Sequence, residues 1–267
     1  MIFMRSKAIV FDNSGTLIER YRIIKDLNTG EFITDINSLS LIDNLDCGAL
    51  SILQFNTSCL SKLDPDTLIS DLINDYHIHF TVSYSTRRLS HDEILSIIND
   101  GDGVISDITD GFSILKKQVP NMEICNGTAL ILDCKNRNIA YTITTAGRFF
   151  KNAIFTVDKL KNRDYDIFIA SGDRSDAIQT LTEFLDIDPS HGFPTATPLG
   201  KRDIVKSLKK DYDRVVMVGD GQNDYYAFQE SDLAILTIAQ SLIESDQLIS
   251  SSDYIVNDLI ELLNILY

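Results

Sequence analysis

The stretch KAIVFDNSGTL, residues 7–17, joins an apolar run to a carboxylate and a tight turn. Its first five residues have the length and composition of a buried strand, and Asp12 follows directly at the end of that strand. Far downstream, the apolar run VVMV at residues 215–218 leads into GDGQND at residues 219–224. Open α/β sheets bind ligands at the carboxyl ends of their strands. The two strings therefore predict a carboxylate-built, cation-assisted site.

The composition limits the class of protein and its partners. A chain of 267 residues suggests two domains at about 150 residues each. Its 24 basic and 39 acidic residues give a net charge of −15, which repels nucleic acid and anionic membranes. We therefore expect no nucleic-acid and no membrane partner, whereas the oligomeric state stays open.

The apolar stretches and the cysteine positions indicate the cellular compartment and the state of the thiols. No apolar stretch approaches the roughly 20 residues of a membrane span, and residues 1–5 are too few for a signal peptide. We expect a soluble, cytoplasmic protein. The cysteines at positions 47, 59, 125 and 134 have no metal-ligand spacing, which favours buried thiols over a zinc or disulfide framework.

The carboxyl-terminal half alternates predicted strands and helices. Strands are expected at residues 166–170, 214–218, 233–238 and 254–256, and helices near residues 149–162, 174–185, 201–210, 223–230 and 258–266. With residues 7–11, these strands make a Rossmann-like, doubly wound sheet of about five parallel strands. The right-handed crossover rule places helices on both of its faces.

A long segment near the amino terminus does not follow this rhythm. It combines a helix signal at residues 64–75 and a capping box, Ser90 with Glu93, with strand-like runs at residues 78–84, 128–132 and 139–144. We predict an α+β cap domain over residues 21–145, inserted into a catalytic core formed by residues 1–20 and 146–267.

The carboxylates suggest phosphoryl chemistry. An aspartate can attack a phosphoryl group and hold it as an acyl phosphate, which divides a difficult transfer into two steps. The negative charges that meet there require a divalent cation and a fixed positive side chain. Mg²⁺ prefers such carboxylate and carbonyl oxygens. Because the chain has no GxxxxGK[ST] loop, phosphate binding is expected from backbone N–H groups near Gly15.

Four motifs occur in the order of a known family. They are DNSGTL at residues 12–17, ASGD at residues 170–173, Lys201 after TPLG, and GDGQND at residues 219–224. In this the chain resembles the haloacid dehalogenase superfamily of phosphohydrolases, and within it the phosphorylation domain of P-type ATPases. The resemblance covers about residues 5–20 and 147–260, whereas the cap matches no motif of that family.

The resemblance implies a role for each matching residue. Asp12 would be the nucleophile and a Mg²⁺ ligand, and Ser171 and Lys201 would contact the transferring phosphoryl group. The remaining metal ligands would be the Ser14 carbonyl, Asp220 and Asp224. Further contacts to phosphate or substrate would come from Ser14, Gly15, Thr16, Gly172 and Asn223, with Asp173 in support.

One departure bears on mechanism. Most phosphatases of this superfamily have a second aspartate two residues after the nucleophile, where this chain has Ser14. General acid–base catalysis contributes about 10²- to 10⁴-fold, so its loss predicts slow turnover or a long-lived aspartyl phosphate, unless a cap residue substitutes or the leaving group is good. We predict a Mg²⁺-dependent phosphohydrolase of a small phosphorylated substrate. The alternatives are a soluble ATPase-like phosphotransfer protein with a durable phosphoenzyme, or a phosphoryl-ligand sensor or partner-binding protein whose site binds but barely turns over.

Overall fold

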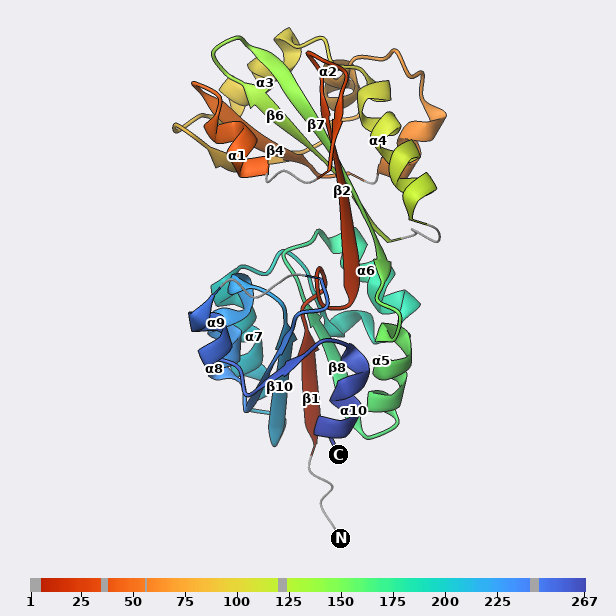
Figure 1. The fold of residues 1–267 in the computed structure, drawn as a ribbon, viewed down its shortest axis with the longest axis vertical. Coiled ribbons are helices and arrows are strands. Elements are labelled where there is room, and N and C mark those ends of the chain that lie inside the picture. Colours follow the sequence, from red (N-terminus) through yellow and green to blue (C-terminus); the bar gives the residue numbers. More distant parts are fainter. Residues whose placement is uncertain (1–5, 35–37, 56, 120–123, 241–244) are drawn as a thin grey trace. The chain divides into compact units, whose positions relative to one another are not determined.

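The computed structural model describes residues 6–34, 38–55, 57–119, 124–240 and 245–267 (Figure 1). The chain divides into two compact units. The core unit consists of Met1–Arg20 and Arg148–Tyr267, and the inserted unit consists of Tyr21–Gly147.

The core unit contains a six-stranded sheet with the order β12-β11-β10-β1-β8-β9, in which every pair of neighbours is parallel. Its strands are β1 (Lys7–Phe11), β8 (Tyr165–Ala170), β9 (Gly192–Phe193), β10 (Arg214–Gly219), β11 (Leu233–Thr237) and β12 (Tyr254–Val256). The predicted parallel sheet is confirmed, with the addition of β9. Strand β9 has only two residues, too few to show the hydrophobic periodicity by which a strand is recognised in a sequence.

The helices of the core unit are α5 (Ala153–Lys161), α6 (Ser175–Phe184), α7 (Pro198–Leu208), α8 (Tyr225–Glu230), α9 (Asp246–Ser250) and α10 (Leu262–Ile265). Short 3₁₀ turns lie at Pro189–His191 (η2), Gln222–Asp224 (η3) and Leu259–Glu261 (η4). The predicted start of the first helix at Phe149 was wrong, because that residue ends a long strand. Helix α9 was not predicted.

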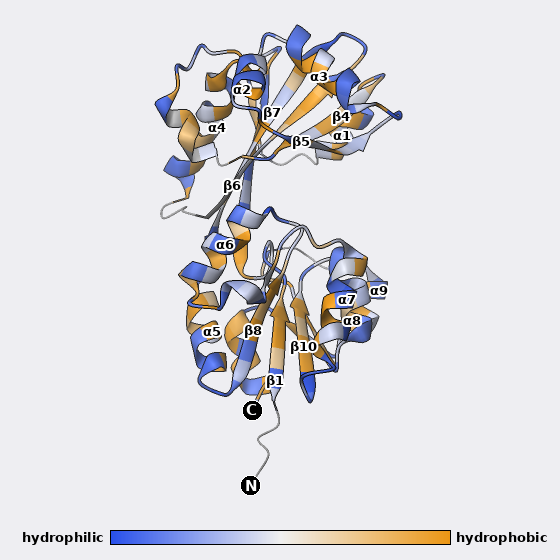
Figure 2. Ribbon diagram, turned by 180° about the vertical axis from the view of Figure 1, so that it is seen from behind, coloured by the Kyte–Doolittle hydropathy of each residue, from blue (hydrophilic) through white to orange (hydrophobic). Residues whose placement is uncertain are grey.

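Alternating side chains of the core strands pack against helices on both faces of the sheet. Ala8 and Val10 belong to an apolar cluster that includes Val205 of α7 and Phe228 of α8. The residue between them, Ile9, is also fully buried. Figure 1 shows α7 and α8 on one side of these strands and α5 and α10 on the other, and Figure 2 shows the strands as predominantly hydrophobic. This two-sided burial is the reason for the near-continuous apolar runs in the sequence.

The inserted unit contains a second sheet with the order β3-β2-β7-β6-β4-β5. The pairs β2·β3, β4·β5, β4·β6 and β6·β7 are antiparallel. The elements are β2 (Ile18–Asp26), β3 (Phe32–Ile33), β4 (Gly48–Leu53), β5 (Phe80–Ser85), β6 (Ile124–Asp133), β7 (Asn138–Phe149), α1 (Ser38–Asp43), η1 (Thr57–Lys62), α2 (Ile69–Asp75), α3 (His91–Asp100) and α4 (Ile105–Gln118). The combination of a parallel core sheet with an antiparallel second sheet confirms the predicted fold class.

Both faces of this second sheet are covered. Leu130 and Leu132 of β6 belong to a cluster with residues of α2, α3 and α4, whereas Ile131 faces the opposite cluster with Ile42 of α1. The capping box predicted at the start of α3 is confirmed: Ser90 Oγ accepts a hydrogen bond from Glu93 N at 3.2 Å, and Ser90 N donates to Glu93 at 2.8 Å.

Two further predictions can be compared with the structure. Among the described residues, no helix combines the length and the apolar character that a membrane crossing requires. Cys134 is buried and Cys47 is half-buried, but Cys59 is exposed, so the prediction of buried thiols was wrong for Cys59. The side chain of Cys125 lies outside the described residues.

Candidate active site

Asp12 is positioned by the backbone of the central strand and its neighbour. Its N–H donates to the carbonyl of Val218 on β10 at 2.8 Å, which extends the parallel ladder by one step beyond β1. The chain then turns tightly, because the N–H groups of Leu17 and Ile18 both donate to the carbonyl of Asn13 at 2.9 Å. Asp12 as a whole residue is only 3% exposed. A carboxylate is thus held below the surface at the carboxyl end of a strand.

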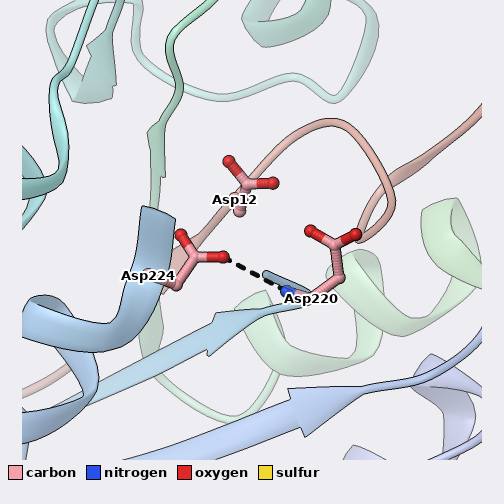
Figure 3. Close-up of side chains that lie close together, drawn as sticks. All are labelled: Asp12, Asp220 and Asp224. Carbon is pink, nitrogen blue, oxygen red and sulfur yellow. Dashed lines mark hydrogen bonds between the residues drawn. The ribbon is translucent and has the colours of Figure 1, made fainter. Parts of the chain in front are cut away.

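Two more carboxylates meet Asp12 from the end of β10. One oxygen each of Asp12, Asp220 and Asp224 lies within 4.8 Å of the others, and Figure 3 shows the three side chains converging. Asp224 is oriented by backbone N–H groups, since its Oδ2 accepts from Asp220 N at 3.2 Å and from Gly221 N at 3.3 Å. The structure therefore brings together the two strings that lie some two hundred residues apart in the chain.

Lys201 joins this cluster from the first turn of α7. That helix begins with Pro198 after Thr197, whose hydroxyl accepts from Gly200 N at 3.1 Å. The ammonium group of Lys201 donates to Asp12 Oδ1 at 2.5 Å and to Asp224 Oδ1 at 2.6 Å. Lys201 is completely buried. A buried lysine needs such partners, because an unpaired charge would lose its hydration without compensation.

The local electrostatics leave an excess of negative charge. Burial raises the pKa of Asp12 well above its usual value, and the charge of Asp224 adds to that rise. Burial and Asp224 likewise raise the pKa of Asp220 to about 6, although Lys201 and Arg20 oppose the rise. Burial lowers the pKa of Lys201, but Asp224 and Asp12 outweigh it and raise that pKa overall. One lysine is insufficient to balance three carboxylates.

A second cluster lies beside Asp12 and is centred on Asp173, at the end of β8. Asp173 Oδ2 accepts hydrogen bonds from Asn13 Nδ2 at 2.7 Å, Ser171 Oγ at 2.8 Å and Ser14 Oγ at 3.2 Å. The guanidinium of Arg20 pairs with Asp173 Oδ1 at 2.8 Å. Although burial opposes it, Arg20 and these hydrogen bonds hold the pKa of Asp173 below its usual value. Asp173 is therefore an ionised carboxylate.

The remaining residues predicted for the site have different surroundings. The hydroxyls of Ser14 and Ser171 both contact Asp173. Thr16 is completely buried, and within the described part of the chain its hydroxyl has no hydrogen-bond partner. Gly172 and Asn223 are exposed. Their predicted roles toward phosphate stay predictions.

Three residues that surround the site were not among the predicted site residues. Asn13 donates to Asp173, Arg20 contacts both Ser14 and Asp173, and Gln240 binds the backbone of Arg20. Asn13 could have been suspected from its place beside Asp12. Arg20 comes near Ser14 through the tight turn, which also forms a bridge between Ser14 and Ile18. No pattern in the sequence predicts that this turn brings Arg20 close to Ser14.

The residues present fit a hard divalent cation. Asp12, Asp220 and Asp224 offer oxygen ligands from two adjacent strand ends, the donor type that Mg²⁺ prefers. Their shared negative charge is only partly offset by Lys201. A bound divalent ion would complete this balance, and the three aspartates are the residues that would hold it.

Gly15 is required for the approach of Asp220. It has a φ of +86°, and a Cβ added there would lie 1.9 Å from Asp220 Oδ2. We predict that Gly15→Ala displaces the Asp220 carboxylate and weakens Mg²⁺ affinity on the order of 10- to 100-fold, the scale seen when groups that orient a metal ligand are lost. Isothermal titration of the purified variant with Mg²⁺ measures this directly.

Gly30 provides the matched control. Its φ is +74°, but a Cβ added there meets no atom within 4 Å. Gly30→Ala therefore carries the cost of a left-handed backbone, on the order of 1 kcal/mol, without a collision. Equal Mg²⁺ affinity in Gly15→Ala and Gly30→Ala would contradict the proposed role of Gly15.

Comparison with known proteins identifies the family. A family model described as haloacid dehalogenase-like hydrolase matches residues 6–232. The chain belongs to the haloacid dehalogenase-like hydrolases. It is 34% identical to a soluble P-type ATPase-like phosphatase of Methanocaldococcus jannaschii, over 97% of this chain and 92% of that relative. This agrees with the family to which the four motifs point.

Larger members of the P-type ATPases are also similar to this hydrolase over part of their length. The chain is 28% identical to a probable copper-importing P-type ATPase A of Enterococcus hirae, over 46% of this chain and 17% of that protein. Among solved structures, a phospho-aspartyl intermediate analogue of phosphoserine phosphatase aligns over 99% of this chain and 100% of that one. Its TM-score is 0.45 at 16% identity.

Proposed function

We propose that this hydrolase is a Mg²⁺-dependent phosphatase that acts on a small phosphorylated substrate through an aspartyl phosphate on Asp12. One observation carries the proposal: the buried Asp12 carboxylate is hydrogen-bonded to Lys201 and lies within a group of three aspartates that fits a divalent cation. The P-type ATPase-like phosphatase of M. jannaschii, which matches almost the whole chain, supports a phosphoryl substrate.

The geometry assigns a task to each side chain. A carboxylate oxygen of Asp12 attacks phosphorus, a new oxygen–phosphorus bond forms, and the bond to the leaving group breaks. Lys201 contacts Asp12 and can offset the charge of the phosphoryl oxygens there. When bound, Mg²⁺ would neutralise phosphoryl oxygens and orient them for attack. In the second step a water molecule attacks the aspartyl phosphate, which releases phosphate and restores Asp12.

The surroundings of Ser14 favour a variant of this function in which the phosphoenzyme persists. The hydroxyl of Ser14 has too high a pKa to serve as an acid, and the adjacent carboxylate of Asp173 is held ionised. Neither group has a proton to give to a leaving group near neutral pH, and the Ser14 hydroxyl cannot act as the base that activates water in the second step. A phosphotransfer protein with a durable aspartyl phosphate is therefore the second candidate function.

Trapping of the phosphoenzyme tests the proposal and separates the two candidates. The full chain is incubated with radiolabelled ATP or acetyl phosphate and Mg²⁺, quenched in acid, and digested. We expect the label on the peptide that contains Asp12, released by hydroxylamine and absent when EDTA replaces Mg²⁺. Phosphate release is measured in the same samples.

The amount of label distinguishes the outcomes. Rapid phosphate release with little label supports a phosphatase, whereas stoichiometric label with slow release supports the durable phosphoenzyme. Asp203→Asn is the matched control for a change at Asp12 and is expected to behave as the wild type, because the Asp203 carboxylate is exposed and pairs with Arg202. Metal-independent turnover, or label on another residue, would sink the proposal.

A further inference from the structure

Arg20 is held at the candidate site from two directions. Its backbone N–H donates to Gln240 Oε1 at 3.0 Å, and its carbonyl accepts from Gln240 Nε2 at 2.5 Å. Its guanidinium donates from one nitrogen, Nη2, to Ser14 Oγ and to Asp173 Oδ1. The side chain is thus fixed beside the turn that carries Asp12 by contacts within the protein.

The hydrogen bonds leave much of the guanidinium available. Arginine has five N–H donors in a planar fork. Within the described part of the chain, the hydrogen bonds of this side chain all start from Nη2. The remaining donors are on Nε and Nη1, and the side chain is 41% exposed. Arg20 therefore combines a fixed position with donors that a ligand can reach.

Exposure shows on which side of the phosphoryl group these donors lie. In phosphoryl transfer the attacking and leaving oxygens are roughly in line on opposite sides of phosphorus. The attacking oxygen belongs to Asp12, which is 3% exposed, so the leaving group points away from the interior. Lys201, at 0% exposure, is confined to the inner side. The Arg20 side chain, at 41% exposure, lies toward the outer side.

The chemistry of the leaving group creates a need for such a cation. The hydroxyl of Ser14 is not an acid near neutral pH, and Asp173 accepts a hydrogen bond from Ser14 and pairs with Arg20, so a leaving oxygen receives no proton from them and departs with developing negative charge. A guanidinium cannot provide a proton either, because its pKa is above about 12. It can, however, donate hydrogen bonds to an oxyanion and offset its charge.

We propose that Arg20 is a further catalytic residue that binds the leaving-group oxygen of the substrate and stabilises its negative charge, in place of a proton donor. The inference rests on the proposed phosphatase function. It also specifies the substrate class more closely: phosphate esters and anhydrides whose leaving group departs as an anion are the preferred substrates.

A series of aryl phosphates tests this role. The full chain with Mg²⁺ is assayed on substrates whose phenol leaving groups have pKa values between about 5 and about 10. Stabilisation of a developing oxyanion reduces the dependence of kcat/KM on leaving-group pKa. We expect Arg20→Gln to make that dependence steeper, with kcat/KM lowered on the order of 10²-fold for the poorest leaving group and far less for the best.

Two further variants support the comparison. Arg20→Lys retains the charge and is expected to recover part of the loss, since lysine lacks the planar fork. Arg148→Gln is the matched control: Arg148 has the same side-chain exposure of 41% and pairs with Glu19 at 2.8 Å. It is expected to retain the wild-type slope.

The outcomes separate this inference from the proposed function. A loss in Arg20→Gln that is uniform across the series would overturn the inference and leave the phosphatase function intact, because it indicates a contact unrelated to the leaving group. An unchanged slope and rate would do the same. If the wild-type protein hydrolyses none of the aryl phosphates but forms the phosphoenzyme on Asp12 in the trapping assay, the inference fails and the proposed function stands.

Discussion

Asp12→Asn is expected to lower phosphate release by a factor on the order of 10⁴ or more, the scale of losing a nucleophile. Asparagine preserves the size of the side chain but cannot attack phosphorus to form an acyl phosphate. The fold should survive, because the change removes one negative charge from three crowded, largely buried carboxylates. We expect its thermal midpoint, measured without added metal, to equal or exceed that of the wild type.

Phosphate release and the thermal midpoint together distinguish a loss of chemistry from a loss of structure. A variant that is inactive and at least as stable as the wild type has lost chemistry and not structure. Asp203→Asn, an exposed carboxylate on the same helix as Lys201, is expected to retain full activity. Wild-type turnover in Asp12→Asn would rule out Asp12 as the nucleophile.

The strands of the core unit could be predicted from the sequence because they are buried on both faces and therefore appear as short, continuous apolar runs. The runs that became β1 and β10 are buried on both faces, and each ends in a polar string. Parallel neighbours bring such strings to the same edge of the sheet, so the convergence of Asp12, Asp220 and Asp224 could be anticipated.

The inserted unit was harder to predict because charges and glycine obscure its periodicity. Strand β2 has the sequence IERYRIIKD, in which polar residues interrupt the apolar pattern. Helix α4 contains Gly111, where a Cβ would lie 2.7 Å from Thr144 Oγ1 of β7. The close packing of α4 against β7 thus requires a glycine there, and a glycine within a helical pattern weakens the prediction of a helix.

The cluster around Asp173 could be predicted only in part. Ser171 and Ser14 were expected near phosphate, but their hydroxyls also orient a carboxylate that sequence reasoning treated as a supporting contact. Arg20 lies at the start of a strand and resembles any solvated charge in the sequence. Its backbone is held by the Gln240 amide, more than two hundred residues away in the chain.

Lys201→Met is expected to turn over much more slowly than the wild type and to be clearly less stable. Its removal withdraws the ammonium group that bridges Asp12 and Asp224, leaving two buried carboxylates without that partner. Breaking a buried ion pair from one side costs about 3–5 kcal/mol. Loss of the charge that faces the phosphoryl group should lower turnover on the order of 10²- to 10³-fold.

Chemical denaturation with and without Mg²⁺ distinguishes the electrostatic cause from a packing defect. A divalent cation held by the same carboxylates would replace part of the missing charge, so the loss of unfolding free energy should be smaller in Mg²⁺ than in EDTA. Lys209→Met, near the end of the same helix, breaks a half-buried pair with Asp232 and is expected to cost about 1 kcal/mol or less in either buffer. An equal loss for Lys201→Met in the two buffers would indicate that Lys201 stabilises the fold by packing, independently of a cation at the three aspartates.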